Sequence, residues 1–266
     1  MTKYAKVCAM GMQNSLAYRS NYVVGLVAAC FPMLLQWMLW QAIFNYTQAA
    51  TLYGLSYPQM MSYVVLAALM TQALRSGFEY EIAEDIKSGG LNRFLVQPIS
   101  YLGYRFCAFI GTHSGFFVIT VVLMFVAYGI ATHYWQLDSD WRSSMLFIPA
   151  VLNAFLLQFM LFYLLSLVAF WLQEVWGIFE AVRVISLVLS GAVVPLTVFP
   201  QPLQWWLSLL PFQYIVYFPL QVLNGLLSAP EILSGLAMQS FWLVVFYLIS
   251  CKVWRMGCRD YVALGS

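Results

Sequence analysis

The sequence predicts an all-α polytopic membrane protein with six transmembrane helices. Of its 266 residues, 63% are hydrophobic and only 8% are charged, whereas charged residues make up about 25% of an ordinary soluble domain. Long apolar runs bounded by charged or turn residues recur along the chain, and about 20 apolar residues suffice to cross the hydrocarbon core of a bilayer. The 10 tryptophans suit anchoring at the two membrane interfaces. We therefore treat residues 1–266 as a single transmembrane domain.

The apolar runs define the expected elements in chain order. Residues 1–20 carry Lys3, Lys6 and Arg19 among apolar residues, a pattern typical of an N-terminal interfacial helix lying on the membrane surface. A polar, uncharged connection is expected at residues 45–58. The six spans are expected at residues 22–44, 60–74, 104–130, 145–172, from 178 onward, and 236–253.

The fifth span contains too many helix breakers for one straight helix. These residues are Ser190, Gly191, Pro195, Pro200, Pro202 and Pro211. The apolar residues between the prolines favour a location in or near the membrane, where neighbouring protein must satisfy any broken backbone. We expect residues 191–235 to form broken re-entrant helices and an external segment.

Basic residues determine the expected orientation. With the N-terminus in the cytoplasm, 11 of the 12 Lys and Arg residues face the cytoplasm, and only Arg142 faces outward. The reverse orientation would violate the preference of basic loops for the cytoplasmic side. We therefore expect both termini and the connection between spans two and three in the cytoplasm.

That connection, residues 78–100, concentrates the charge of the chain. Phe78, Ile82 and Ile86 recur every four residues, which places them on one face of an amphipathic helix. The acidic residues Glu81, Glu84 and Asp85 fall on other faces, and Glu84 and Asp85 either contact a partner or keep the helix in water.

Two glycines then interrupt the amphipathic helix. Gly89 and Gly90 suit a left-handed helix end. A second helical turn is expected at residues 91–96, ended by Pro98. Residues 78–100 are thus expected to form two short helices joined at a glycine corner.

Several chemistries are disfavoured by the absence of their motifs. No G-x-x-x-x-G-K-[ST] phosphate loop occurs, so ATP binding through such a loop is excluded for this chain. With only His113 and His133, and five cysteines outside any metal-ligand spacing, no metal site is expected. A net charge of +2 does not indicate nucleic-acid binding.

Two stretches resemble the membrane subunits of type-2 ATP-binding-cassette exporters. Residues 84–100 read Glu-Asp-Ile-Lys-Ser-Gly-Gly-Leu-Asn-Arg-Phe-Leu-Val-Gln-Pro-Ile-Ser. They are similar to that family's cytoplasmic connection, which is acidic-rich, then glycine, then Leu-x-Arg-Leu-Leu-x-x-Pro-Leu-Ser. Residues 190–195, Ser-Gly-Ala-Val-Val-Pro, and the segment to Tyr214 resemble the family's broken fifth span. Asn92 departs from the family pattern, where an acidic residue is common, and so does the sequence Leu-Pro-Phe at 210–212.

The resemblance implies an exporter permease that is no enzyme by itself. It implies a dimer with a second copy or a related permease subunit in the inner membrane of a bacterial cell, in contact with membrane lipids. Transport would be powered by a separate ATPase subunit that holds ATP and Mg, with no cofactor in this chain. The residues expected to couple to that ATPase are Glu81, Glu84, Asp85, Lys87, Gly89, Gly90, Leu91, Arg93, Phe94, Leu95 and Pro98.

Two other functions remain open at this point, a membrane-embedded lipid-modifying enzyme and an ion-coupled carrier. The first needs convergent polar groups within the membrane, and the second needs a mid-membrane acidic residue. Glu180 and Arg183 are expected at the cytoplasmic end of the fifth span, where their side chains can reach water.

A substrate pathway is suggested by Trp37, Trp40 and Phe44, although aromatic residues at span ends are more often interfacial anchors. His113 either lines the pathway or packs between helices, and the small residues around it favour packing.

Overall fold

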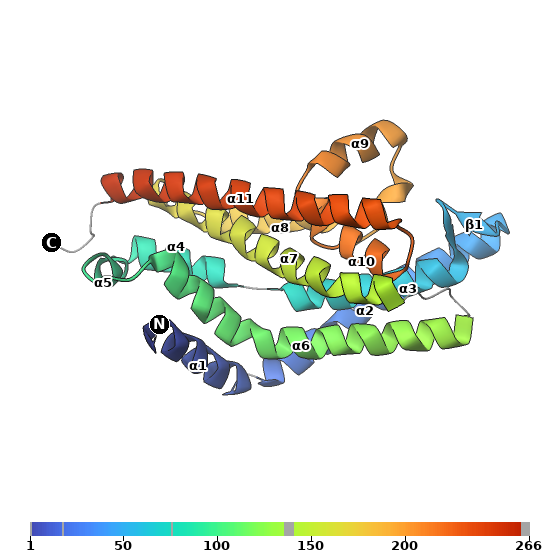
Figure 1. Cartoon of the computed structure of the whole chain (residues 1–266), viewed down its shortest axis with the longest axis horizontal. Coiled ribbons are helices and arrows are strands. Elements are labelled where there is room, and N and C mark those ends of the chain that lie inside the picture. Colours follow the sequence, from blue (N-terminus) through green and yellow to red (C-terminus); the bar gives the residue numbers. More distant parts are fainter. Residues whose placement is uncertain (1, 18, 76, 136–140, 262–266) are drawn as a thin grey trace.

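Four helices in the described part of the chain are long and apolar enough to cross a membrane. They are Tyr22–Thr47, Tyr101–Trp135, Trp141–Phe170 and Ala229–Asp260. The computed structural model describes residues 2–17, 19–75, 77–135 and 141–261. Its long helices run roughly along a common axis, as Figure 1 shows. The prediction of an all-α polytopic membrane protein is thus confirmed at this level.

The helices follow the expected order along the chain. They are α1 (Thr2–Ala17), α2 (Arg19–Thr47), α3 (Tyr57–Leu74), α4 (Phe78–Lys87), α5 (Asn92–Leu95), α6 (Tyr101–Trp135), α7 (Trp141–Ser166), α8 (Trp176–Leu189), α9 (Gln201–Leu209), α10 (Tyr217–Leu223) and α11 (Ala229–Asp260). With 18 and 14 residues, α3 and α8 are shorter than the four long helices. The start of α1 and the end of α11 lie at the same end of the molecule as α4 and α5 (Figure 1).

The connection between α2 and α3 contains a small hairpin. Strands β1 (Thr51–Leu52) and β2 (Leu55–Ser56) pair antiparallel. Tyr53 and Gly54 form the turn with φ of 54° and 81°, the left-handed conformation that a two-residue hairpin turn requires. Because Ser56 and Gln59 then form a capping box, α3 begins at Tyr57, three residues before the expected start of the second span.

The helix α1 packs along the first half of α6 (Figure 1). The two backbones approach so closely that a Cβ at Gly111 would lie 2.3 Å from the carbonyl oxygen of Cys8, and a Cβ at Gly11 would lie 2.9 Å from the Cα of Gly111. The backbone N–H of Ser100 also donates to the Tyr4 hydroxyl at 3.0 Å. The predicted interfacial helix is therefore attached to a long helix of the bundle.

The chain after α8 is irregular. Gly191 has a φ of 80° and follows the end of α8. Its carbonyl oxygen accepts a hydrogen bond from the Tyr63 hydroxyl at 2.6 Å, and the carbonyl oxygen of Ser190 accepts one from the N–H of Tyr217 at 2.9 Å. These bonds satisfy backbone groups that the broken helix leaves open.

Prolines precede three of the short helical pieces of this segment. Pro195 and Pro200 immediately precede a 3-10 turn (Leu196–Val198) and α9, and Pro211 immediately precedes a second 3-10 turn (Phe212–Tyr214). Proline is suited to these positions because its missing N–H has no helical partner to lose there.

Candidate functional site

The apolar face of α4 is buried against the bundle. Phe78, Ile82 and Ile86 are nearly inaccessible to solvent. The ring of Phe78 lies 5.0 Å from that of Phe109 in α6 and 4.9 Å from that of Phe159 in α7. The four-residue spacing in the sequence thus corresponds to the face that fixes α4 on two long helices.

The corner between α4 and α5 depends on two glycines. Gly89 has a φ of 80°, a region that favours glycine. A Cβ at Gly90 would lie 3.1 Å from Asp85 Oδ1. The N–H of Leu91 donates to the carbonyl oxygen of Asp85 at 2.9 Å, and the Leu91 side chain is fully buried.

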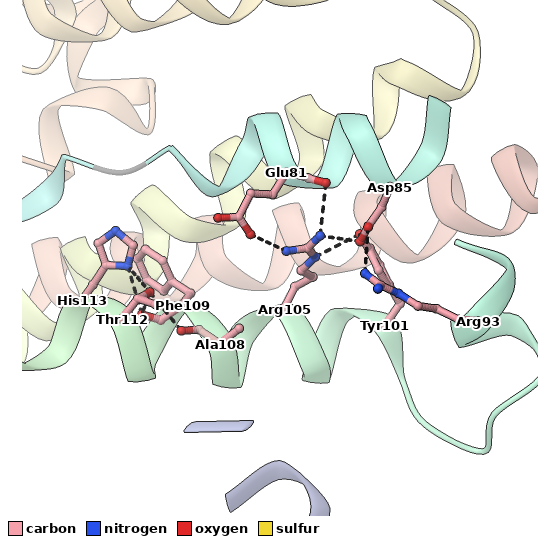
Figure 2. A network of polar contacts seen from close by, with 9 residues as sticks. All are labelled: Glu81, Asp85, Arg93, Tyr101, Arg105, Ala108, Phe109, Thr112 and His113. Atoms are coloured by element: carbon pink, nitrogen blue, oxygen red, sulfur yellow. Dashed lines mark hydrogen bonds and ion pairs between the residues drawn. The ribbon is translucent and has the colours of Figure 1, made fainter. Parts of the chain in front are cut away.

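The buried Arg105 of α6 connects α4 to the bundle (Figure 2). Its Nη1 donates to Glu81 Oε2 at 2.7 Å, and its Nη2 donates to the Glu81 carbonyl oxygen at 3.1 Å and also contacts Asp85 Oδ2. Its Nε donates to the Tyr101 hydroxyl at 3.0 Å. All three guanidinium nitrogens therefore have a partner.

Both carboxylate oxygens of Asp85 are occupied as well. Oδ2 accepts from the Tyr101 hydroxyl at 2.8 Å besides contacting Arg105, and Oδ1 accepts from Arg93 Nη2 at 3.1 Å (Figure 2). A buried carboxylate is stable only with such partners. Asp85 thus links the glycine corner to α6.

A second ion pair lies on another side of α4. The buried Glu79 contacts Arg183 of α8 through Oε1. Arg183 Nε lies 3.8 Å from Glu180 Oε1, and the Tyr80 hydroxyl donates to the same Glu180 oxygen. Residues 104 positions apart in sequence thus join α4 to the broken fifth segment.

Burial dominates the electrostatics of this second pair. It raises the pKa of Glu79 above the ordinary value of 4.5, and nearby Arg183 offsets part of the rise. Partial burial and the hydrogen bond to Glu180 raise the pKa of Tyr80 to about 12. Glu79 Oε2 is buried and has no hydrogen-bond partner among the described residues.

Glu79 and Arg183 line a cavity of about 430 Å³. Charged and amide side chains at α3, α4, α7 and α8 form part of its wall, and the rest is mainly apolar residues of these helices, of α2 and of the segment after α8. Cavities of about 300–1,000 Å³ accommodate drug-sized ligands. The site therefore has two parts, the α4–α5 corner and this adjoining cavity.

The residues expected to couple to a partner differ in exposure. Glu81, Glu84, Arg93 and Pro98 are exposed, Lys87, Gly89 and Gly90 are half-buried, and Asp85, Leu91 and Phe94 are buried. The Phe94 ring packs 5.0 Å from that of Tyr101 and 4.7 Å from that of Tyr104, so it fills a pocket of this chain. The Leu95 side chain lies outside what the structure describes. Among the side chains of the corner that the structure describes, Val96 is the most accessible large apolar one, at 84% exposure.

Three of the residues suggested for a substrate pathway, Trp37, Trp40 and Phe44, belong to one packed cluster, and His113 lies elsewhere, in α6. Trp40 and Phe44 are buried with Met60 and Met61 between α2 and α3. Trp37 packs against this cluster and also lines a mainly apolar cavity. His113 Nδ1 lies 2.8 Å from Thr112 Oγ1 and 3.1 Å from the Phe109 carbonyl oxygen, so this ring nitrogen has its partners within α6 itself (Figure 2).

Sequence reasoning did not identify Glu79, Tyr101 and Arg105 as members of this site. The sequence did contain a feature that could have identified Tyr101 and Arg105. Arg105 lies near the start of an apolar span, and Tyr101 precedes it by four residues, about one helical turn. Ionisable residues in such spans are rare and need a partner. The identity of that partner became visible only in the fold.

The comparison with protein families agrees with this architecture. A family model described as ABC-2 family transporter protein matches residues 30–265. The chain belongs to this family. No curated protein matches it. The resemblance found in the sequence is thereby confirmed, and membership in the ABC-2 family identifies the chain as a membrane component of a transporter, which suggests that it is not itself an enzyme.

Proposed function

We propose that this ABC-2 family chain is the permease of an ATP-driven exporter and works as a dimer with separate ATPase subunits. ATP and Mg are bound by the ATPase, and the movement that follows reaches the permease through the α4–α5 corner. The second permease is a copy of this chain or a related subunit.

In this proposal the chain crosses the membrane six times, through α2, α3, α6, α7, the broken segment beginning with α8, and α11. The distribution of basic residues supports cytoplasmic termini. The common location of the α1 start, the α11 end and the α4–α5 corner at one end of the molecule fits this topology (Figure 1). The membrane is then the bacterial inner membrane.

One observation carries the proposal: the α4–α5 corner is exposed on its outer side and fixed by ion pairs on its inner side. Glu84 and Val96 are exposed, whereas Arg105 and Arg183 tie α4 to α6 and α8. A force applied to the exposed side is therefore transmitted to two helices of the bundle. A solvated loop would need neither connection.

The test is co-purification of an ATP-binding-cassette ATPase with the tagged full chain in mild detergent. Val96→Asp places a charge on the exposed side of the corner, where the native side chain makes little contact with its own chain. We expect this variant to lose most of the bound ATPase and of the ATP-driven transport, because an unpaired charge in an apolar contact is strongly unfavourable.

The matched control is Tyr46→Asp at the end of α2, near the hairpin. Tyr46 is 90% exposed, so the two substitutions disturb the fold equally little. The control should retain the ATPase. Equal retention of the ATPase by both variants would contradict the proposed role of the corner.

A further inference from the structure

The cavity lined by Glu79 has charged residues at one end and mainly apolar residues at the other. Its charged residues, Arg75, Glu79, Glu180 and Arg183, lie at the end where α3 stops and α8 starts. That end adjoins α4, since the Tyr80 and Trp176 rings are 4.7 Å apart.

The opposite end of the cavity is mainly apolar. Pro32 of α2, Ala192, Ile215 and Val216 line it. The helix α8 separates the two ends by about 15 Å between Glu180 and Ser190, at 1.5 Å per residue. A polar end and an apolar wall of this length match the head group and the start of the chain of a lipid.

The charges at the polar end balance. Arg75 and Arg183 contribute two positive charges, and Glu79 and Glu180 contribute two negative charges. A ligand with a net charge would leave that charge uncompensated near the membrane interior, at a substantial cost. The lining therefore favours a head group that is neutral overall and still offers polar contacts.

Two groups define what the head group must offer. Glu79 lines the cavity, and its Oε2 is buried and has no hydrogen-bond partner in the described part of the chain. It can accept an N–H bond. Arg75 has an exposed side chain and no ion pair among the described residues, so its guanidinium can bind an anionic group.

We propose that the cavity binds a zwitterionic membrane lipid with a primary ammonium group, the ammonium at Glu79 and the acidic group at Arg75. Placing the polar end at the cytoplasmic leaflet rests on the proposed function and its topology. The lipid then contacts α4 directly through Glu79. Lipid binding can therefore affect α4, the helix that couples to the ATPase in the proposed function.

A matched pair of probes tests the hydrogen-bond requirement. Lauroyl lysophosphatidylethanolamine and lauroyl lysophosphatidylcholine have the same tail, phosphate and net charge, but the choline group has no N–H to donate. Native mass spectrometry counts each lipid bound to the full chain released from dodecyl maltoside micelles. We expect about tenfold tighter binding of the ethanolamine lipid, because a hydrogen bond to a charged acceptor is among the stronger ones.

Single substitutions test which residue contacts the ammonium group and which contacts the acidic group of the lipid. Glu79→Gln should abolish the preference for ethanolamine over choline, and Arg75→Gln should weaken both lipids by a similar factor. Glu174→Gln, which changes an exposed carboxylate outside the cavity lining, is the charge-matched control and should bind like the unmodified chain. The lipid-free melting temperature of each variant verifies its folding.

Several outcomes would overturn the inference. Equal binding of the two lipids by the unmodified chain, tighter binding of lauroyl lysophosphatidic acid, or an unchanged preference in Glu79→Gln would each do so. Dodecyl maltoside is present in excess, so a site for sugar head groups would appear as loss of the ethanolamine preference. Because the Val96→Asp test concerns a different surface, the lipid inference can fail while the ATPase coupling holds, and the reverse.

Discussion

The helix α4 carries two ion-pair sites that differ in completeness. At the Arg105 site, all three guanidinium nitrogens and both Asp85 oxygens have partners within the chain. At the Arg183 site, Glu79 keeps one buried oxygen without a partner in the described structure and faces a cavity. The two sites are held by the same short helix and connect it to different parts of the bundle.

This difference in hydrogen-bond satisfaction makes the Arg105 site a fixed joint between α4 and α6. It makes the Arg183 site an adjustable joint between α4 and α8. A buried polar network with every group satisfied is rigid, because any movement leaves a group unpaired. A site with a free acceptor can gain a partner, so its energy depends on what occupies the cavity. We infer that α4 moves together with α6, while its connection to α8 responds to the ligand.

The largest effect should come from Arg105→Met. The substitution keeps an unbranched side chain but leaves Asp85 and the Tyr101 hydroxyl without their main partner. Removing one partner of a buried pair costs about 3–5 kcal/mol, so the full chain should unfold at a much lower temperature in micelles. Intrinsic tryptophan fluorescence follows the transition.

The double variant Arg105→Met with Asp85→Asn provides the control for that measurement. It removes the uncompensated carboxylate and should recover part of the lost stability. If Arg105→Met unfolds at the temperature of the unmodified chain, the Arg105 site is not the fixed joint.

The next effect concerns the glycine corner that the Arg105 site holds. Gly89→Ala forces an L-residue into the left-handed region, which costs about 1–2 kcal/mol. The control is Gly115→Ala in α6, where a Cβ would meet no neighbour within 4 Å. Thermal unfolding should show a loss for the first variant only, and a loss of equal size in both would show that the corner is unstrained.

A smaller effect, of opposite sign, is expected at the Arg183 site. Because burial raises the pKa of Glu79, the folded chain binds this proton more tightly than the unfolded chain does. Stability from this group is therefore complete below its ordinary pKa and falls as the pH rises through the folded pKa. Glu79→Gln remains neutral, so it should match the unmodified chain near about pH 4 and exceed its stability near about pH 8.

Unfolding midpoints across this pH range measure the difference. Glu84→Gln, on the exposed side of the same helix, is the control for the loss of one carboxylate. A Glu79→Gln variant that is less stable at high pH would mean that the attraction of Arg183 outweighs burial.

The smallest effect is expected for Arg93→Ala. The Arg93 side chain is 62% exposed while it bonds to Asp85, and exposed ion pairs contribute only about 0.2–1 kcal/mol. Its unfolding midpoint should differ little from that of the unmodified chain. A loss as large as that of Arg105→Met would make Arg93 an equal member of the fixed joint.

Local patterns explain what could be predicted. The four-residue spacing of Phe78, Ile82 and Ile86 and the glycine pair after them are signals within a dozen residues, and α4, the corner and α5 follow them. The membrane class followed from composition, and the family followed from two short stretches in the expected order.

The pairing of charges could not be predicted in the same way. Glu84 and Asp85 are neighbours with similar chemistry, yet one is exposed and the other is buried. What separates them is Arg105, 20 positions beyond Asp85, and Glu79 likewise depends on Arg183, 104 positions away. Such partners are set by helix packing, which no local spacing reveals.

The aromatic residues show the same limit. Tryptophan and phenylalanine near a span end suit an interface, a pathway or a packed core equally well. Trp40 and Phe44 belong to a packed cluster because α3 lies against α2 there, which depends on the hairpin and on the early start of α3.

The close approach of α1 to α6 has a consequence for synthesis of the protein. Gly11 meets Gly111, so 100 residues separate the two sides of the contact. At about 5–20 residues per second, α1 leaves the ribosome about 5–20 s before its partner exists. During that interval the basic residues Lys3 and Lys6 can hold α1 at an anionic membrane surface. The contact between α1 and α6 therefore forms late in synthesis, after α6 has been made.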